Sequence, residues 1–256
     1  MPDFKLLGPI EVLDERDRPF TPSGPKVRQV LSLLALNPGK IVDVNLFVNE
    51  LWGEEAPKDQ LNTLQTHIYH LRRILDRVGP PAGRLVVTRA PGYLLRVDPQ
   101  RVDALVFPRL VEEGARHYRA GDHATAEQVL RKALDLWSGP ALADVRRGAV
   151  LGPHATALEE QRLRALEMHM DARILQGLHG ELIEELRVLV AAHPLNENFH
   201  AQLITSLSRA GRRTDAFRAY EGLRALLDAE LGVEPTFDIK NLQPNSPAVS
   251  HSGKEV

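Results

Sequence analysis

The sequence predicts a mostly α-helical protein with a minor β part, divided into two domains. The first hundred residues combine short extended segments with three helical patterns, and from residue 103 onward the helical pattern is continuous. A chain of 256 residues is long enough for two hydrophobic cores. Its hydrophobic and charged fractions, 43% and 26%, are those of an ordinary globular protein.

Composition excludes several classes of site. The chain has no cysteine, which rules out disulfides, thiolate nucleophiles and zinc bound through sulfur. The N-terminal sequence lacks the pattern of a secretory signal, and no run of about 18 apolar residues occurs, so we expect a cytoplasmic location and no membrane contact. A pI near 6.6 argues against non-specific coating of nucleic acid. Any binding to nucleic acid must therefore come from a local patch.

The first elements are expected to be a small sheet and two helices. Residues 4–20 alternate loosely and break at turn residues, which predicts short antiparallel strands. The turn at 21–25 carries hydroxyls that could cap a helix beginning at Lys26. Asp43 is the expected N-cap of a second helix, which Gly53 should end.

The third helix, from Asp59 to Arg77, has two contrasting sides. Apolar residues recur at steps of three and four and should face a core: Leu61, Leu64, Ile68, Leu71 and Leu75. The opposite side and its flank carry amides, hydroxyls, a phenol, an imidazole and guanidinium groups but no carboxylate: Asn62, Thr63, Gln65, Thr66, Tyr69, His70, Arg72 and Arg73. Such a face suits a polyanion with readable base edges.

A hairpin, RLVVTRAPGYLLRV, follows this helix, and the charge of the whole stretch is biased. Between Asp59 and Arg96 there are six Arg, no Lys and two Asp, a local net of +4 in a chain of net charge -2. Three helices, the third polar on its outer side, followed by a hairpin predict a winged helix-turn-helix over residues 1–98.

Residues 103–235 are expected to form an all-α, tetratricopeptide-like domain. Asp103 should cap its first helix, and the later helices should run near 154–178, 181–193, 196–210 and 214–231. Three glycines, Gly121, Gly180 and Gly211, precede similar small-then-large spacings, as in helix-pair repeats, but at unequal intervals. Residues 236–256 are polar with Pro and Ser, so we expect a disordered tail.

Several sequence segments resemble those of known protein families. The segments LFVNELWG, LNTLQTHIYHLRRIL and TRAPGYLLRV resemble the DNA-binding domain of OmpR-type response regulators. Later segments, among them VDALVFPRL, ALDLWSGPALADV and LEEQRLRALE, resemble the bacterial transcriptional activation domain. Together these domains define the Streptomyces antibiotic regulatory protein family, SARP, and the resemblance covers residues 4 to about 235.

The resemblance implies a transcriptional activator. Two or more copies would bind direct repeats in double-stranded promoter DNA, self-associate there and recruit RNA polymerase holoenzyme through its sigma subunit. The helical domain would support assembly and polymerase contact, and the targets would be secondary-metabolite (antibiotic) biosynthesis genes.

The same resemblance suggests how the polar residues divide the work. Phosphate or sugar contacts are expected from Asn62, His67, Arg72, Arg73 and Trp52, and more weakly from Lys26 and Arg28. Base contacts are expected from Gln65, Thr66 and His70 in the major groove and from Arg89 in the minor groove. The alternatives are a solvated helix face for the arginine pair, helix capping for Asn62, and ordinary surface polarity for Gln65, Thr66 and His70. For Arg89 the alternative is a surface charge on the hairpin, and Trp52 is expected to pack mainly in the core.

No enzyme, metal or cofactor site is predicted. His67 and His70 have the spacing of a metal pair but no third ligand nearby. The motifs GxxxxGK[ST], HExxH and GxSxG are absent from the sequence. The alternative to a DNA-binding activator is an adaptor whose helical half binds a peptide and whose winged helix mediates protein contacts.

Overall fold

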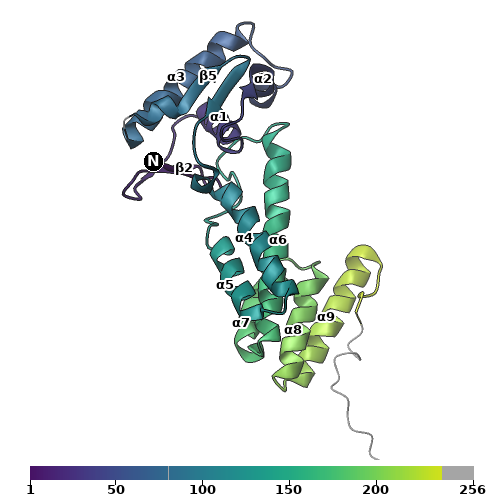
Figure 1. Ribbon diagram of the computed structural model, residues 1–256. Coiled ribbons are helices and arrows are strands. Elements are labelled where there is room, and N and C mark those ends of the chain that lie inside the picture. The colour runs from purple at the N-terminus through teal and green to yellow at the C-terminus, as the bar shows by residue number, and fades with distance from the viewer. Residues whose placement is uncertain (80, 238–256) are drawn as a thin grey trace, which may run out of the picture. The chain divides into compact units, whose positions relative to one another are not determined.

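The computed structural model describes residues 1–79 and 81–237 (Figure 1). The chain forms two compact units, of which the first is Met1–Met168 and the second begins at His169. Each unit is described separately below. None of the described helices has the length and apolar character needed to cross a membrane.

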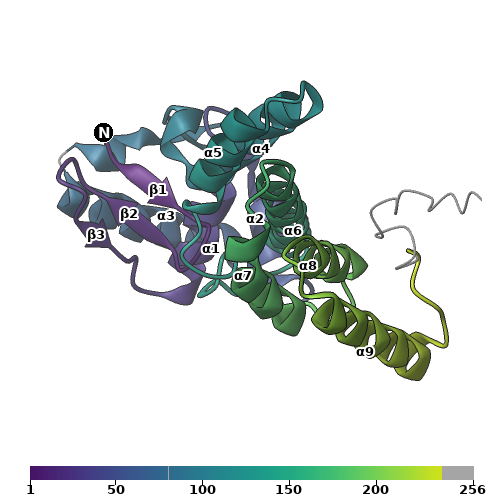
Figure 2. The same cartoon turned by 90° about the horizontal axis from the view of Figure 1, so that it is seen from below.

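A small antiparallel sheet opens the first unit. Its strands are β1 (Asp3–Lys5), β2 (Glu11–Leu13) and β3 (Pro19–Phe20), in the order β1-β2-β3. Phe4 pairs with Val12, and both side chains are buried. Figure 2 shows this sheet beside α1 and α3, so its apolar face closes one side of the core.

Three helices follow: α1 (Pro25–Ala35), α2 (Val44–Trp52) and α3 (Gln60–Val78). Asp43 accepts a hydrogen bond from the Asn45 N–H and caps α2, as predicted. The predicted hydroxyl cap of α1 is wrong. The N-cap is Gly24, which has no side chain, and Pro at the next position has no N–H to satisfy.

The apolar side of α3 faces the core at four of its five predicted positions. Leu64, Ile68, Leu71 and Leu75 are at most 1% exposed. Leu61 is 47% exposed, so its predicted burial is wrong. It lies in the first turn of α3, outside the core that holds the other four.

The hairpin forms a wing. Its strands β5 (Val86–Arg89) and β6 (Gly92–Leu95) follow a short helical turn, η1 (Ala82–Leu85), and β6 also pairs with β4 (Val42–Asp43). A Cβ atom on Gly92 would lie 1.8 Å from the Val42 carbonyl oxygen, so the β4–β6 pairing requires glycine here. Tyr93 packs edge-on against Phe47 with ring centroids 6.1 Å apart, so it helps to hold the wing on α2.

The first unit continues through η2 (Pro99–Arg101), α4 (Asp103–Arg119), α5 (His123–Leu134) and the first part of α6 (Leu151–Leu175). Asp103 does not cap α4 as predicted, because Val102 occupies the N-cap position. The buried Asp103 carboxylate instead accepts hydrogen bonds from the N–H groups of Leu6 (2.8 Å) and Leu7 (3.2 Å). It therefore joins α4 to the N-terminal sheet.

The second unit contains α7 (His179–Ala192), α8 (Glu197–Arg209) and α9 (Arg213–Leu231), which pack in succession. The repeated turns lie at Gly121, Gly177 and Gly211, with φ of 79°, 85° and 80°. At each turn the glycine N–H donates to the carbonyl of the residue three positions earlier. The N–H of the residue after the glycine donates to the carbonyl five positions before that residue. The second of these turns was predicted at Gly180, which instead lies within α7.

The last two of these turns are 34 residues apart, the period of a tetratricopeptide repeat. The fold class is thus as predicted: mostly α with a minor β part, a winged helix-turn-helix followed by an all-α helical domain. Of the predicted disordered tail, Thr236 binds Glu197 and the Phe237 ring lies 6.0 Å from that of Tyr220. Residues 238–256 lie outside the described residues.

Candidate nucleic-acid interface

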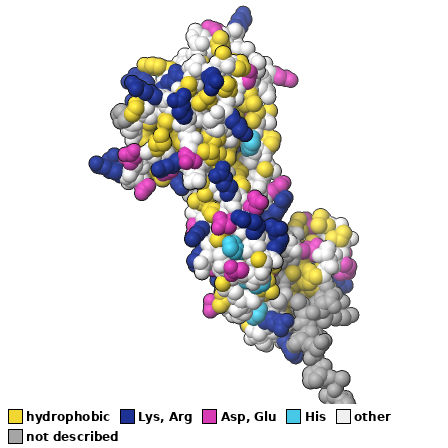
Figure 3. Space-filling model, viewed as in Figure 1, with side chains coloured by type: hydrophobic (Ala, Val, Ile, Leu, Met, Phe, Trp, Pro, Cys, Tyr) yellow, Lys and Arg dark blue, Asp and Glu magenta, His cyan; other side chains and the backbone are white. Residues whose placement is uncertain are grey.

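The outer face of α3 is exposed along its whole length. Gln65, Thr66, His70 and Arg73 are all solvent-exposed, and the ring of Tyr69, 55% exposed, lies 5.8 Å from that of His70. In the view of Figure 3, Lys and Arg side chains lie among apolar ones over α3 and the wing. The face presents donors, acceptors and an aromatic ring with no carboxylate among them.

The first turn of α3 is stabilised by its own polar residues. The Asp59 carboxylate accepts from both the backbone N–H (3.3 Å) and the side-chain amide (3.1 Å) of Asn62. The Thr66 hydroxyl donates to the Asn62 carbonyl at 3.0 Å. Asp59 is therefore the N-cap of α3, and the exposed Asn62 supports that cap through its amide NH₂, in line with its alternative interpretation.

The two adjacent arginines of α3 differ in their surroundings. Arg72 is half-buried, and its guanidinium donates from Nε to the Val86 carbonyl (3.0 Å) and from Nη2 to the Thr88 hydroxyl (2.9 Å). Arg73 is exposed and makes no hydrogen bond or ion pair with a described residue. The structure thus gives Arg72 an internal use, joining α3 to β5, and leaves Arg73 as the free cation of the pair.

The end of α2 forms a corner with α1 and α3, which we call the Trp52 corner: Lys26, Trp52 and His67. The Trp52 ring lies 6.2 Å from the His67 ring and 5.7 Å from Lys26 Nζ, and Lys26 donates to the Leu51 carbonyl. Burial, and then the charges of His70 and Lys26, lower the pKa of His67. His67 is therefore a neutral hydrogen-bonding group at neutral pH.

Arg28, one of the two weak candidates for phosphate contact, forms hydrogen bonds within the protein. Its Nε donates to the Pro22 carbonyl (2.9 Å), and its Nη1 lies 3.1 Å from the Asp144 carbonyl and 3.3 Å from the Asp144 carboxylate. The side chain is only 25% exposed. Arg28 thus ties α1 to the segment that precedes α6.

Arg89 ends β5 at the tip of the wing, opposite Gly92. Its side chain is exposed and makes no hydrogen bond or ion pair with any residue that the structure describes. Only Ala90 and Pro91 separate the two strands, so the arginine projects from a tight, two-residue connection. A free guanidinium on such a tip can enter a narrow groove.

Sequence reasoning gave no role to three residues that matter here. Tyr69 is the most exposed aromatic side chain on α3, and its spacing from Arg73 already indicated the same face. Glu50 and Asp144 bind distant backbone N–H groups, of Gly148 and of Ile10 respectively. No local pattern could have indicated these contacts, because the partners are 98 and 134 residues apart.

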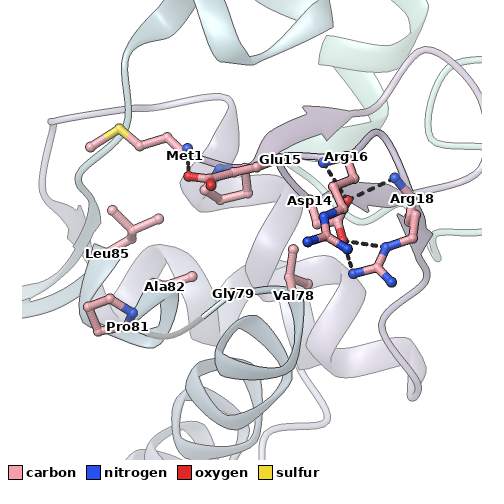
Figure 4. A pocket seen from close by; sticks show the side chains of 11 residues that line it. Met1, Asp14, Glu15, Arg16, Arg18, Val78, Gly79, Pro81, Ala82 and Leu85 are labelled. Atoms are coloured by element: carbon pink, nitrogen blue, oxygen red, sulfur yellow. Dashed lines mark hydrogen bonds and ion pairs between the residues drawn. The ribbon is translucent and has the colours of Figure 1, made fainter.

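The part of the chain that the structure describes offers no metal-binding cluster, and it contains a surface pocket. Within residues 1–79 and 81–237, no group of three His, Asp or Glu residues could hold a metal ion. A surface pocket of about 500 Å³ lies between the turn after β2 and the end of α3 (Figure 4). It contains two ion pairs, Met1 N with Glu15 and Arg18 with Asp14. The side chains of Glu15 and Arg18 are exposed, and the Asp14 side chain, 11% exposed, is paired with Arg18.

Comparison with known proteins identifies both halves of the chain. Residues 20–95 match the family described as "Transcriptional regulatory protein, C terminal", and residues 102–245 match the "Bacterial transcriptional activator domain". The regulatory protein DnrI of Streptomyces peucetius is 42% identical, covering 99% of this chain and 96% of its own length. The transcriptional regulator RedD of Streptomyces coelicolor is 39% identical over 91% of this chain and 67% of its own.

A solved structure, Mycobacterium tuberculosis EmbR in complex with a low affinity phosphopeptide, superimposes with a TM-score of 0.85 at 31% identity. The match covers 94% of this chain and 63% of the EmbR chain. Fold, domain matches and relatives agree, and the chain belongs to the Streptomyces antibiotic regulatory protein family of transcriptional regulators.

Proposed function

We propose that this protein is a sequence-specific DNA-binding activator of transcription whose α3 enters the major groove. The observation that carries the proposal is the exposed, carboxylate-free outer face of α3, in a segment of local net charge +4. Phosphate attraction supplies much of the affinity of such proteins, and polar side chains on a groove-bound helix supply the sequence preference. Family membership supports the same role.

Base reading is assigned to three exposed side chains on the outer face of α3. Gln65 offers an amide that can pair with adenine, Thr66 a methyl group and hydroxyl, and His70 an imidazole, all in exposed positions. Arg89 at the wing tip is assigned to the minor groove, where a narrow A/T-rich stretch attracts a guanidinium.

Phosphate contact is assigned to Arg73, Asn62 and the Trp52 corner. We add Tyr69, whose exposed phenol on the same face can donate to a phosphate oxygen. Arg72 and Arg28 were expected to contact phosphates, but their guanidiniums bond to internal acceptors. We therefore assign them to holding the wing and the segment before α6 in place.

The wider activity is proposed from the family. Two or more copies would bind direct repeats upstream of a promoter and associate with one another there. The helical domain, residues 103–235, would contact RNA polymerase holoenzyme, including its sigma subunit, while residues 1–98 hold the DNA. Secondary-metabolite biosynthesis genes are the proposed targets, and the site of action is the nucleoid in the cytoplasm.

In-vitro selection of bound duplexes from a random pool tests DNA recognition. The full chain should enrich a short half-site that recurs in the same orientation, and its spacing should give the number of copies bound. A variant carrying both His70→Ala and Arg73→Ala serves as the control and should enrich a site that lacks the preference at one or two base pairs, with weaker binding. Absence of an enriched sequence, together with no gel shift at low salt, would favour the adaptor alternative.

Transcription from a promoter that carries the selected site tests activation separately. Added to purified RNA polymerase holoenzyme, the protein should increase transcript yield only when the repeats are present. Retention of DNA binding with no increase in transcript would remove the activator assignment and leave a DNA-binding regulator of another kind.

A further inference from the structure

The segment between α5 and α6 is fixed against α1 and α2 at two points. At one, Asp144 bonds to Arg28 of α1 and accepts from the Ile10 N–H at 2.8 Å. At the other, the buried Glu50 carboxylate of α2 accepts from the N–H groups of Gly148 (2.6 Å) and Val150 (2.7 Å). Figures 1 and 2 show the beginning of α6 beside α2, as these bonds require.

The contact with α2 is also close sterically. A Cβ atom at Gly148 would lie 2.6 Å from the Glu50 carbonyl oxygen, so the backbone of the segment rests directly on the backbone of α2. Residues between Asp144 and Gly148 are therefore held against α1 and α2 and cannot move away independently.

Two arginines lie between these fixed points, and they differ. Arg147 turns back on its own segment and donates to the Ala141 carbonyl at 2.5 Å. Arg146 is exposed and has no hydrogen bond or ion pair with any described residue. It is thus a free cation held at a defined place on the surface.

Arg146 and Lys26 are both held at the end of α2. Gly148, two residues after Arg146, donates to Glu50, and Lys26 donates to the carbonyl of the next residue, Leu51. Burial is the main cause of the lowered pKa of Lys26, and the charge of Arg146 lowers it further. Glu50 acts in the opposite direction, but its carboxylate is already shared by three backbone N–H groups. Two cations held together with so little compensation form a site that an anion would stabilise.

We propose that Arg146 contacts a DNA phosphate next to those held by the Trp52 corner. The proposal rests on the proposed DNA-binding function and extends it, because residue 146 belongs to the stretch that matches the activator domain. A guanidinium suits a phosphate through two parallel N–H bonds, and phosphate is the anion that DNA presents along the side of the groove. The helical half of the chain therefore takes part in DNA binding itself.

The test compares full-length wild type with Arg146→Ala, Arg146→Lys and Arg109→Ala. Arg109 is a matched control, since it is an exposed, unpaired arginine on α4 of the same unit. Affinity is measured over a series of salt concentrations for two labelled duplexes of equal length, one with the selected site and one of unrelated sequence. Arg146→Ala should lower the slope of log K against log salt by about 0.9, the value for one phosphate, on both duplexes.

Arg146→Lys should keep most of the wild-type slope because the positive charge remains, and Arg109→Ala should keep all of it. In an ethylation interference experiment, modification of one phosphate at the edge of the footprint should weaken binding of wild type but not of Arg146→Ala. A slope for Arg146→Ala equal to that of Arg109→Ala, or an equal loss for Arg146→Lys and Arg146→Ala, overturns the proposal. If wild type binds neither duplex, the proposed DNA-binding function itself has failed.

Discussion

Arg72 and Val86 are joined by a hydrogen bond of 3.0 Å from the guanidinium Nε to the carbonyl oxygen, with Nη2 of the same side chain 2.9 Å from the Thr88 hydroxyl. One side chain thus connects the middle of α3 to two positions on β5. Arg89 is the next residue along that strand. These hydrogen bonds therefore connect α3, which is assigned to the major groove, with the strand that carries Arg89, which is assigned to the minor groove.

Replacing Arg72 by Lys tests this connection. Lysine keeps the positive charge but cannot form both bonds, so the free energy of unfolding should fall by about 1 to 2 kcal/mol in urea denaturation. The preference for A/T at the position read by Arg89 should weaken, while the salt slope stays at its wild-type value. Arg73→Ala is the counterpart, and it should leave stability unchanged and lower the salt slope by about 0.9. If Arg72→Lys lowered the salt slope without loss of stability, and Arg73→Ala lowered stability without changing the slope, Arg72 and not Arg73 would be the phosphate contact.

Replacing His70 by Ala should change the selected sequence itself. Loss of one base contact should remove the preference at one or two base pairs and cost on the order of 1 to 3 kcal/mol on the original site. Affinity for unrelated duplexes should change little, because the phosphate contacts remain. Selection with wild type and variant in parallel provides the measurement, and an unchanged sequence logo would show that His70 reads no base.

The sequence was sufficient for features that depend on near neighbours along the chain. The steps of three and four predicted the burial of Leu64 and Ile68, because the helical period is a local property. Asp43 was recognised as a cap for the same reason. The exposure of Leu61 could not be predicted, since it depends on where the core ends and not on the period.

Candidate site residues were harder to assign when their partners came from another element. Arg72 and Arg73 are indistinguishable in sequence, and only the position of β5 separates an internal arginine from a free one. Arg146 lies 94 positions after Trp52, and its place depends on the fixed segment between Asp144 and Gly148. Long-range hydrogen bonds of this kind follow from tertiary packing, which no spacing rule describes.

Asp103 should give the protein a pH-dependent stability. Burial, which outweighs the hydrogen bonds from Leu6 and Leu7, raises the pKa of Asp103 from 3.8 to about 6. The folded state then holds this proton more tightly than the unfolded state. The contribution of Asp103 to the free energy of unfolding should therefore rise as the pH falls from about 6 to about 4, by on the order of 2 to 3 kcal/mol, and stay constant above about pH 7.

Urea denaturation of wild type and Asp103→Asn at several pH values isolates this contribution, since all other carboxylates are common to both proteins. Relative to Asp103→Asn, wild type should lose stability as the pH increases through that window. Asp135→Asn, which removes an exposed carboxylate on the same unit, should run parallel to wild type. Parallel curves for wild type and Asp103→Asn would mean that the pKa is not raised in the folded protein.

Replacement of two glycines by alanine should change the stability of the protein in opposite directions. Gly92→Ala would place its Cβ 1.8 Å from the Val42 carbonyl oxygen, a backbone atom, and should lower stability by roughly 1 to 3 kcal/mol. Gly222, within α9, has open space around its Cβ position, and Gly222→Ala should raise helix stability by about 0.5 to 1 kcal/mol. Thermal unfolding followed by circular dichroism measures both, and equal shifts would contradict the steric argument.

Glu50 holds the beginning of α6 on α2, and Glu50→Gln should separate them. The carboxylate accepts from Gly148 through Oε1 and from Val150 and Leu151 through Oε2. Glutamine replaces one oxygen by an NH₂ group, so at least one backbone N–H loses its acceptor and faces another donor. The free energy of unfolding should fall by roughly 2 to 4 kcal/mol, whereas Glu54→Gln, on an exposed side chain, should change it little.

The same variant connects stability to the proposed role of Arg146. Once the segment before α6 is no longer held on α2, Arg146 loses its fixed place beside Lys26, and the salt slope should fall toward that of Arg146→Ala even though Glu50→Gln removes a negative charge. A simple charge effect predicts the opposite, stronger binding to DNA. The direction of the change in DNA affinity therefore decides between an electrostatic and a positional role for Glu50.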